Sequence, residues 1–344
     1  MGAVNTAQKS NVVEHGEVIL QVRDLVKHFP VRMGFWQSMK TKEQPVLRAV
    51  DGVSLDVYKG EILGLVGESG CGKTTLARTI LRLTDATSGE AILEGQNIFD
   101  LNEAEMKKLR RKMQIIFQDP YESMNPRMDV QTVIAEPLIL QGLASSAHDA
   151  RDVVASALAD VEMVPPEEYM GRYPHELSGG QRQRVAVARA LSVDPDFIVA
   201  DEPVSMLDVS IRGEVLNLML RLSRSRGVTF IYITHDLATA RHICDRIAVM
   251  YLGKIVEMGT ADEVIQTPLH PYTTALIGAV FVPDPRHRGF AEVLKGEIPS
   301  PVNPPQGCRL HPRCPYTMDI CKQVEPPLVL HEGTHQVACH RAER

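Results

Sequence analysis

The fold of this chain is decided by the segment Gly67-Glu68-Ser69-Gly70-Cys71-Gly72-Lys73-Thr74-Thr75. The segment fits the phosphate-binding pattern G-x-x-x-x-G-K-S/T. Glycines allow the backbone to turn its N–H groups toward phosphate oxygens, and the helix that follows adds the positive end of its dipole. Lys73 is expected to neutralise the β- and γ-phosphates of a nucleotide, and the Thr74 hydroxyl to ligate Mg²⁺. We take every residue of the segment as a candidate ATP-binding residue.

The residues on either side of this segment favour a strand–loop–helix unit. Residues 62–66 are a short apolar run, and residues 76–81 have the composition of a helix. The alternative is a glycine-rich turn that binds nothing, and this context disfavours it.

Three other apolar runs end on polar residues. They cover residues 114–117, 197–200 and 229–233. Their apolar residues are continuous rather than alternating, which is typical of central strands in a parallel sheet that is covered on both faces. Open α/β sheets bind their ligands at the carboxyl ends of such strands. The polar residues there are therefore candidate site residues.

Asp201 and Glu202 follow the second of these runs. An aspartate at this place can hold Mg²⁺ through water, and the adjacent glutamate can orient or deprotonate the attacking water. The same pair could instead cap a helix. Beside a phosphate-binding loop, the catalytic interpretation is favoured.

A second candidate anion site lies at residues 177–181, Leu-Ser-Gly-Gly-Gln. Ser178 can cap the following helix, and Gly179 and Gly180 expose its first N–H groups. With this pentapeptide the chain resembles the ATP-binding subunits of ABC transporters. The resemblance implies a head-to-tail dimer in which Ser178, Gly179, Gly180 and Gln181 close over ATP held by the opposite subunit.

The same resemblance implies roles for four further residues. Gln118 would sense Mg²⁺ and the attacking water, and His235 would contact the γ-phosphate. Asp208 would lie in the loop that crosses the dimer interface. Phe29 would stack on adenine; the less favoured alternative for a single aromatic residue is an ordinary core position.

The fold class that follows is α/β. We expect a P-loop NTPase core of parallel sheet and helices, an antiparallel β part, an inserted helical subdomain and a small, metal-stapled C-terminal extension. The expected division is a flexible tail at residues 1–17, the ATPase core at 18–118 and 193–262, the helical subdomain at 119–192 and the extension at 263–344. Residues 33–45, with Trp36, are expected to form an irregular insertion.

Three longer segments resemble the oligopeptide/dipeptide branch of these importers. They are residues 118–127, residues 202–205 and His270-Pro271-Tyr272-Thr273. The resemblance implies an ATPase that energises import of peptides. Importers of nickel, glutathione and some oligosaccharides share the branch, so these solutes stay open as alternatives.

Four of the six cysteines lie close together near the C-terminus, at Cys308, Cys314, Cys321 and Cys339. Four thiolates can hold an iron–sulfur cluster or Zn²⁺, and free thiols are the remaining alternative. Similar tails in this branch are associated with a 4Fe–4S cluster, which the resemblance therefore implies here. Such a group would serve to fold a tail that has few apolar residues.

Composition bounds the partners and the location. The net charge of -6 gives no reason to expect a nucleic-acid partner, and the basic residues 107–112 are interpreted as the solvated face of a helix that begins near Asn102. The chain has no bilayer-length apolar run and no secretory leader, so we expect a cytoplasmic protein. The resemblance places it on the inner face of the membrane, with two permease subunits, a paralogous or identical ATPase subunit and, indirectly, a solute-binding protein.

Two rival functions come from other classes. A soluble ABC ATPase acting on DNA or ribosomes would carry long heptad repeats or two cassettes, and this sequence shows neither. A redox-sensing regulator would make the cysteine-rich tail the primary site.

Overall fold

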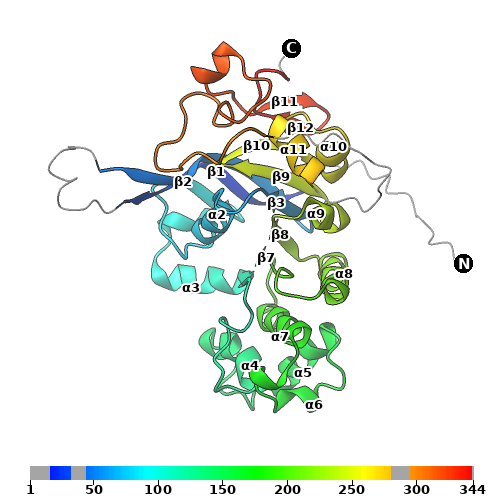
Figure 1. Cartoon of the computed structure of the whole chain (residues 1–344). Coiled ribbons are helices and arrows are strands. Elements are labelled where there is room, and N and C mark those ends of the chain that lie inside the picture. Colours follow the sequence, from blue (N-terminus) through cyan, green and yellow to red (C-terminus); the bar gives the residue numbers. More distant parts are fainter. Residues whose placement is uncertain (1–15, 32–43, 280–293, 343–344) are drawn as a thin grey trace, which may run out of the picture.

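The computed structural model describes residues 16–31, 44–279 and 294–342. The central part of the chain contains two β-sheets with helices packed around them, a group of helices lies beyond β7, and the C-terminal segment lies at the opposite end (Figure 1). Most of the expected N-terminal tail and of the insertion around Trp36 falls outside the described residues.

The main sheet has eight strands in the order β11-β12-β10-β9-β3-β8-β7-β6. The five strands from β9 to β6 are parallel, and β10, β12 and β11 extend the sheet in antiparallel pairs. The bounds are β3 Ile62–Val66, β6 Met113–Ile116, β7 Phe197–Asp201, β8 Thr229–Thr234, β9 Arg246–Tyr251, β10 Lys254–Thr260, β11 Val329–Glu332 and β12 His335–Val337.

The central strands are buried on both faces. In β3, Ile62 and Val66 belong to one hydrophobic cluster, whereas Leu63 and Leu65 belong to another on the opposite face. Successive side chains of a strand point to opposite faces, so a continuous apolar run is what a doubly covered strand requires. The expectation of buried parallel strands is confirmed.

A second sheet of four antiparallel strands has the order β2-β1-β4-β5. Its strands are β1 Val18–Pro30, β2 Val46–Tyr58, β4 Ser88–Leu93 and β5 Gln96–Asn97. The strand β1 is continuous over 13 residues, and its pairing with β2 continues on both sides of irregularities such as the one between Val22 and Leu25.

Within the described residues, six α-helices accompany the two sheets. They are α2 Lys73–Ile80, α3 Glu103–Lys112, α8 Val209–Arg226, α9 Leu237–Ile243, α10 Ala261–Gln266 and α11 Pro271–Ala279. The helix α3 begins where the sequence predicted: Asn102 and Glu105 form a capping box, and basic residues occupy its last turn.

The remaining α-helices form a separate group below the main sheet in Figure 1. They are α4 Val130–Leu140, α5 Arg151–Asp160, α6 Glu167–Met170 and α7 Gly179–Leu191. They lie within the segment for which the sequence predicts a helical insert, residues 119–192; the exact bounds of the division stay a prediction. Short 3₁₀ turns occur at Ile98–Asp100, Pro174–Glu176 and Asp319–Lys322.

The C-terminal segment contributes more regular structure than its proline-rich sequence indicated. The helix α11 packs beside α10, and β12 pairs with β10 at Glu257 and Met258, which adds two strands to the main sheet. Among the described residues, no helix has the length and apolarity needed to cross a bilayer.

Candidate active site

The phosphate-binding loop connects the end of β3 to the start of α2, as predicted. Gly72 caps α2 with a φ of 110°, a conformation that side chains rarely adopt. A Cβ atom here would lie 2.1 Å from the carbonyl oxygen of Ala49. The glycine is therefore required both by the backbone conformation and by the close approach of β2.

Lys73 is the first residue of α2 and is buried. Its ammonium group donates hydrogen bonds to the carbonyl oxygens of Gly67 (2.7 Å) and Glu68 (3.0 Å). It also lies 3.7 Å from the sulfur of Cys71, a buried thiol whose pKa burial raises. The ammonium group is thus held inside the loop, where phosphate oxygens would replace the carbonyl contacts.

Thr74 and Asp201 come from α2 and from the end of β7 and meet directly. The Thr74 hydroxyl donates a hydrogen bond of 3.0 Å to Asp201 Oδ1. Burial raises the pKa of Asp201, although the Thr74 hydrogen bond acts in the opposite direction. A hydroxyl beside a buried carboxylate is a donor set that suits Mg²⁺, which prefers oxygen ligands.

Glu202 lies between Gln118 and His235. Gln118 Nε2 donates to Glu202 Oε2 (3.1 Å), and His235 Nδ1 lies 3.2 Å from Glu202 Oε1. The three residues follow β6, β7 and β8. Glu202 has a positive φ of 45°, a costly conformation for a residue with a side chain and one that is found at functional sites. The structure therefore brings together the polar ends of the three predicted strands.

One cavity of about 640 Å³ joins the phosphate-binding loop to Gln118, Glu202 and His235. A volume of this size is within the range of ligand-binding pockets. Besides residues of the phosphate-binding loop, it is lined by Leu47, Ala49, Gln118, Glu202, His235, Leu276 and Pro301.

Phe29 lies beside this cavity rather than in its described lining. Its partner across the β1–β2 ladder is Leu47, which does line the cavity. Phe29 is 37% exposed, and the Lys27 ammonium group lies 4.7 Å from the centroid of its ring. Contact with adenine stays a prediction for this residue.

The second candidate anion site, at the start of α7, lies apart from the cavity. Ser178 Oγ accepts from the Gln181 backbone N–H (3.3 Å), and Gln181 Oε1 accepts from that of Ser178 (3.0 Å). The cap by Ser178 was predicted from the sequence, and the reciprocal hydrogen bond to Gln181 makes it a capping box. Gly179 follows Ser178, and Gly180 packs against Ile211 so closely that a Cβ would lie 2.6 Å from that side chain. None of these residues is in the described lining of the cavity.

Asp208 is the exposed N-cap residue of α8. Its side chain makes no capping hydrogen bond, and its neighbours Met206 and Val209 are exposed by 65% and 81%.

Tyr272 and Arg313 of the C-terminal segment reach the phosphate-binding loop, and no role was predicted for either from the sequence. Tyr272 and Arg313 both contact Glu68. Tyr272 belongs to the His-Pro-Tyr-Thr segment, which was used above only as a mark of resemblance. Arg313 directly precedes Cys314, a candidate metal ligand. This position was the one feature of the sequence that could have drawn attention to Arg313.

The four cysteines of the tail line a single small cavity, which is also lined by His270, His311 and His340. Burial raises the pKa of Cys308 to about 12 and also raises those of Cys314 and Cys339. No group of three His, Cys, Asp or Glu side chains within residues 16–31, 44–279 and 294–342 is arranged to hold a metal ion. The four cysteines are of the residue type that binds an iron–sulfur cluster or Zn²⁺. Their side chains in this structure are not arranged as a coordination shell.

Four features together define an ATPase of the ABC class. They are the phosphate-binding loop, the Thr74–Asp201 pair suited to Mg²⁺, Glu202 between Gln118 and His235, and the separate glycine-rich start of α7. Comparison with known proteins agrees. Residues 50–205 match the family model described as ABC transporter, and residues 256–321 match the one described as Oligopeptide/dipeptide transporter, C-terminal region.

Similar proteins extend over nearly the whole chain. The oligopeptide transport ATP-binding protein OppF of Salmonella typhimurium is 47% identical over 96% of this chain and 98% of its own length. The oligopeptide transport ATP-binding protein AppF of Bacillus subtilis is 46% identical over 94% of this chain and 97% of its own length. A probable peptide ABC transporter ATP-binding protein of Sinorhizobium fredii is 47% identical over 94% and 90%. The chain therefore belongs to the family of ABC transporter ATP-binding proteins.

Solved structures support the fold. The ATP-binding cassette MJ0796, described as a dimer in a post-hydrolysis state with ADP and Pi, is 30% identical and has a TM-score of 0.61 over 70% of this chain and 98% of that one. The cbiO1 protein of Clostridium perfringens, described as part of an ABC transporter complex, gives a TM-score of 0.60 at 26% identity over 73% and 92%. The expected ABC ATPase core is thereby confirmed.

Proposed function

We propose that this chain is the ATP-hydrolysing subunit that energises an importer of oligopeptides or dipeptides. The observation that carries the ATPase part is the cavity in which Lys73, Glu202 and His235 meet. The peptide part rests on the names of the relatives and on the match of residues 256–321.

Hydrolysis would proceed by in-line attack of water on the γ-phosphorus of ATP. The water oxygen forms a bond to phosphorus while the bond to the β,γ-bridging oxygen breaks, which leaves ADP and phosphate. Glu202 accepts the proton of the water, and Gln118 and His235 hold the Glu202 carboxylate in place. Lys73 stabilises the charge on the transferring phosphoryl group.

Thr74, Asp201 and Gln118 are the residues that would hold Mg²⁺, which when bound neutralises phosphate charge. The Thr74–Asp201 hydrogen bond supports this set for the first two residues. Gln118 qualifies by its place in the cavity wall.

A second ATPase subunit would complete the site. The start of α7, with Ser178, Gly179 and Gly180, is separate from the cavity of its own chain and exposed at Ser178. It would close over the nucleotide of an identical or paralogous subunit, with Asp208 at the interface. Two permease subunits would hold the pair at the inner face of the membrane and receive solute from a binding protein.

The tail cysteines would hold a 4Fe–4S cluster, with Zn²⁺ as the alternative. The convergence of all four on one cavity supports a shared group. Measurement of iron, acid-labile sulfide and zinc on protein purified without oxygen separates the two. Roughly four irons and four sulfides per chain support the cluster, and one zinc supports the alternative. A metal-free chain that keeps its melting temperature would overturn both.

The test of function uses the complex assembled with its membrane partners and a solute-binding protein in lipid, with Glu202→Gln as the blank. ATPase rate is measured with mixed peptides, then with Ni²⁺, glutathione and oligosaccharides. Stimulation by peptides alone supports the proposal, and stimulation by another solute moves the substrate class. A rate that no solute changes would contradict the transport role.

A further inference from the structure

Glu68, the second residue of the phosphate-binding loop, is held by two residues that lie more than 200 positions later in the chain. Its backbone N–H donates a 2.8 Å hydrogen bond to the Tyr272 hydroxyl. Its carboxylate accepts two hydrogen bonds from the Arg313 guanidinium, of 3.0 and 3.4 Å. The loop is therefore attached to the C-terminal segment through both its backbone and a side chain.

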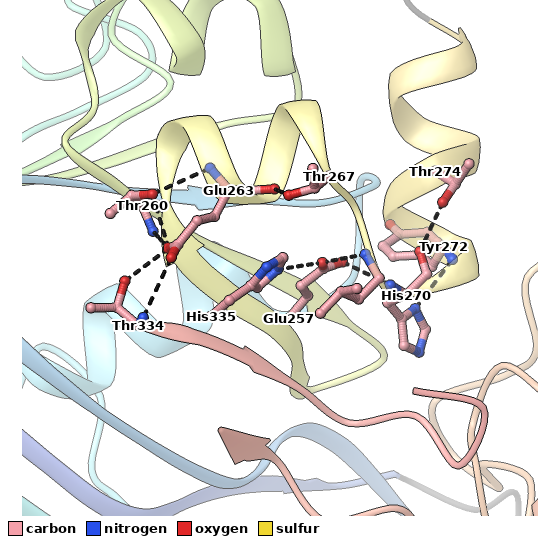
Figure 2. A network of polar contacts seen from close by, with 10 residues as sticks. Glu257, Thr260, Glu263, Thr267, His270, Tyr272, Thr274, Thr334 and His335 are labelled. Carbon is pink, nitrogen blue, oxygen red and sulfur yellow. Dashed lines mark hydrogen bonds and ion pairs between the residues drawn. The ribbon is translucent and has the colours of Figure 1, made fainter. Parts of the chain in front are cut away.

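Tyr272 is placed by a buried polar network (Figure 2). Glu257, a fully buried residue of β10, accepts hydrogen bonds from the backbone N–H groups of Leu269 (2.7 Å) and His270 (3.1 Å) and contacts His335 Nε2 (2.7 Å). His270 Nδ1 in turn accepts from the Tyr272 backbone N–H (3.1 Å). Burial lowers the pKa of His270 to about 4, so the imidazole is neutral and able to accept. The network fixes the start of α11.

Arg313 is placed by the cysteine-rich turn. Its backbone N–H donates to the carbonyl oxygen of Leu310 (2.8 Å), as does that of Cys314 (2.9 Å). The guanidinium lies 5.9 Å from the ring centroid of Tyr251, a ring that also packs against Tyr272. Arg313 is only 8% exposed, so the charge is held in one position.

The contact has an electrostatic consequence for the nucleotide. Glu68 lines the same cavity as Lys73, and its side chain remains 28% exposed. An unpaired carboxylate at this place would repel the triphosphate. A bidentate guanidinium removes most of that repulsion, because it matches a carboxylate in both charge and geometry.

We propose that Arg313 is a positioning residue for ATP: it neutralises Glu68 and fixes its carboxylate, so that the C-terminal extension sets the affinity of the phosphate-binding loop for ATP. This inference rests on the proposed ATP site. It assigns the extension a direct role at the nucleotide, independent of what the cysteines bind.

The test is equilibrium binding of Mg-ATP to the full chain in a Glu202→Gln background, which prevents turnover. We expect Arg313→Ala to weaken ATP binding roughly tenfold, since it leaves one like charge beside the phosphates. Arg313→Lys keeps the charge and should lose less. Lys322→Ala, which breaks an exposed ion pair with Asp319 in the same segment, is the matched control and should change nothing.

The double variant Arg313→Ala with Glu68→Gln distinguishes two effects of losing Arg313: repulsion of ATP by the unpaired Glu68 carboxylate, and loss of structural support for the loop. If repulsion by Glu68 is the cause, the double variant binds ATP within about threefold of the parent. The defect of Arg313→Ala should also shrink as salt rises from roughly 0.05 to 0.5 M, because screening weakens repulsion. Melting temperature and circular dichroism verify that each variant is folded.

Two results would overturn the inference: unchanged ATP affinity in folded Arg313→Ala, or a double variant as weak as the single one. If Arg313→Ala does not fold, the ATP affinities of Arg313→Lys and Glu68→Gln are measured at low and high salt instead. Affinities of Arg313→Lys equal to the parent's at both salt concentrations would then overturn the inference. Failure of the parent chain to bind ATP would instead contradict the proposed function.

Discussion

The chain has two helix starts with glycine-rich sequences, and they are built differently. At α2, the cap is Gly72, which has no side chain to satisfy the first N–H groups, and the loop before it is enclosed by β2, β9 and the C-terminal segment. At α7, Ser178 and Gln181 satisfy each other's N–H groups, and Ser178 is exposed. In the proposed function the first start would receive phosphate within the chain, and the second would offer a stable surface to another subunit.

The largest expected effect tests whether catalysis belongs to the enclosed site. Glu202→Gln should lower the ATPase rate of the assembled complex by roughly 10²–10⁴-fold, the contribution of a general base. Binding of ATP should persist, because Lys73 and the loop are intact. Phosphate release and equilibrium binding measure the two quantities. A rate within about tenfold of the parent would assign the proton transfer to another group.

The next effect separates the two helix starts directly. Gly179→Asp introduces a carboxylate where the nearest atom beyond the helix lies 3.5 Å from the new Cβ and where a helix tolerates negative charge. The isolated chain should bind ATP normally, whereas hydrolysis in the assembled complex should fall at least about 100-fold, because in the proposed dimer the carboxylate would face the partner's phosphates. Gly179→Ala is the control. A parallel loss of ATP binding in the isolated chain would show that α7 serves its own nucleotide.

A smaller effect compares the glycines themselves. Gly72→Ala should lower the free energy of unfolding by about 2 kcal/mol, because its φ is positive and its Cβ meets Ala49. Gly179→Ala should cost no more than about 0.5 kcal/mol. Urea unfolding of both variants gives the comparison. Equal stability of the two would mean that the loop before α2 can relax.

The smallest effect tests how the C-terminal extension is attached to α10, where Thr334 donates hydrogen bonds to Glu263. Burial favours a raised pKa for Glu263, but hydrogen bonds from Thr260 and Thr334 outweigh it and hold the pKa below its ordinary value. This stabilisation is present above the unfolded pKa and is lost as the pH falls through the folded one. Glu263→Gln should therefore cost about 0.5–1 kcal/mol near neutral pH and nothing at strongly acidic pH.

Acid titration of stability in the parent and in Glu263→Gln checks this expectation. The two curves should converge as the pH falls. A constant difference at every pH would mean that shape rather than charge matters at this position.

The sequence predicted the parts of the site that are local. Strands of recognisable pattern end at Asp201 or shortly before Lys73, Glu202 and His235, and parallel strands place their ends at one edge. The sequence could not predict the contacts of Glu68, because a hydrogen bond across 245 positions leaves no periodic trace. Nor could it predict β12, a three-residue strand whose pairing depends on an edge formed far away in sequence.

The contact between Glu257 and His335 has a consequence for synthesis of the chain on the ribosome. The two residues are 78 positions apart, and His335 lies close to the C-terminus. At about 5–20 residues per second, roughly 4–16 s separate their translation. During that time the outer edge of β10 has no β12 to cover it, and an uncovered strand edge invites pairing with other chains. A nascent chain of this protein therefore passes through a stage at which chaperone protection of one sheet edge matters most.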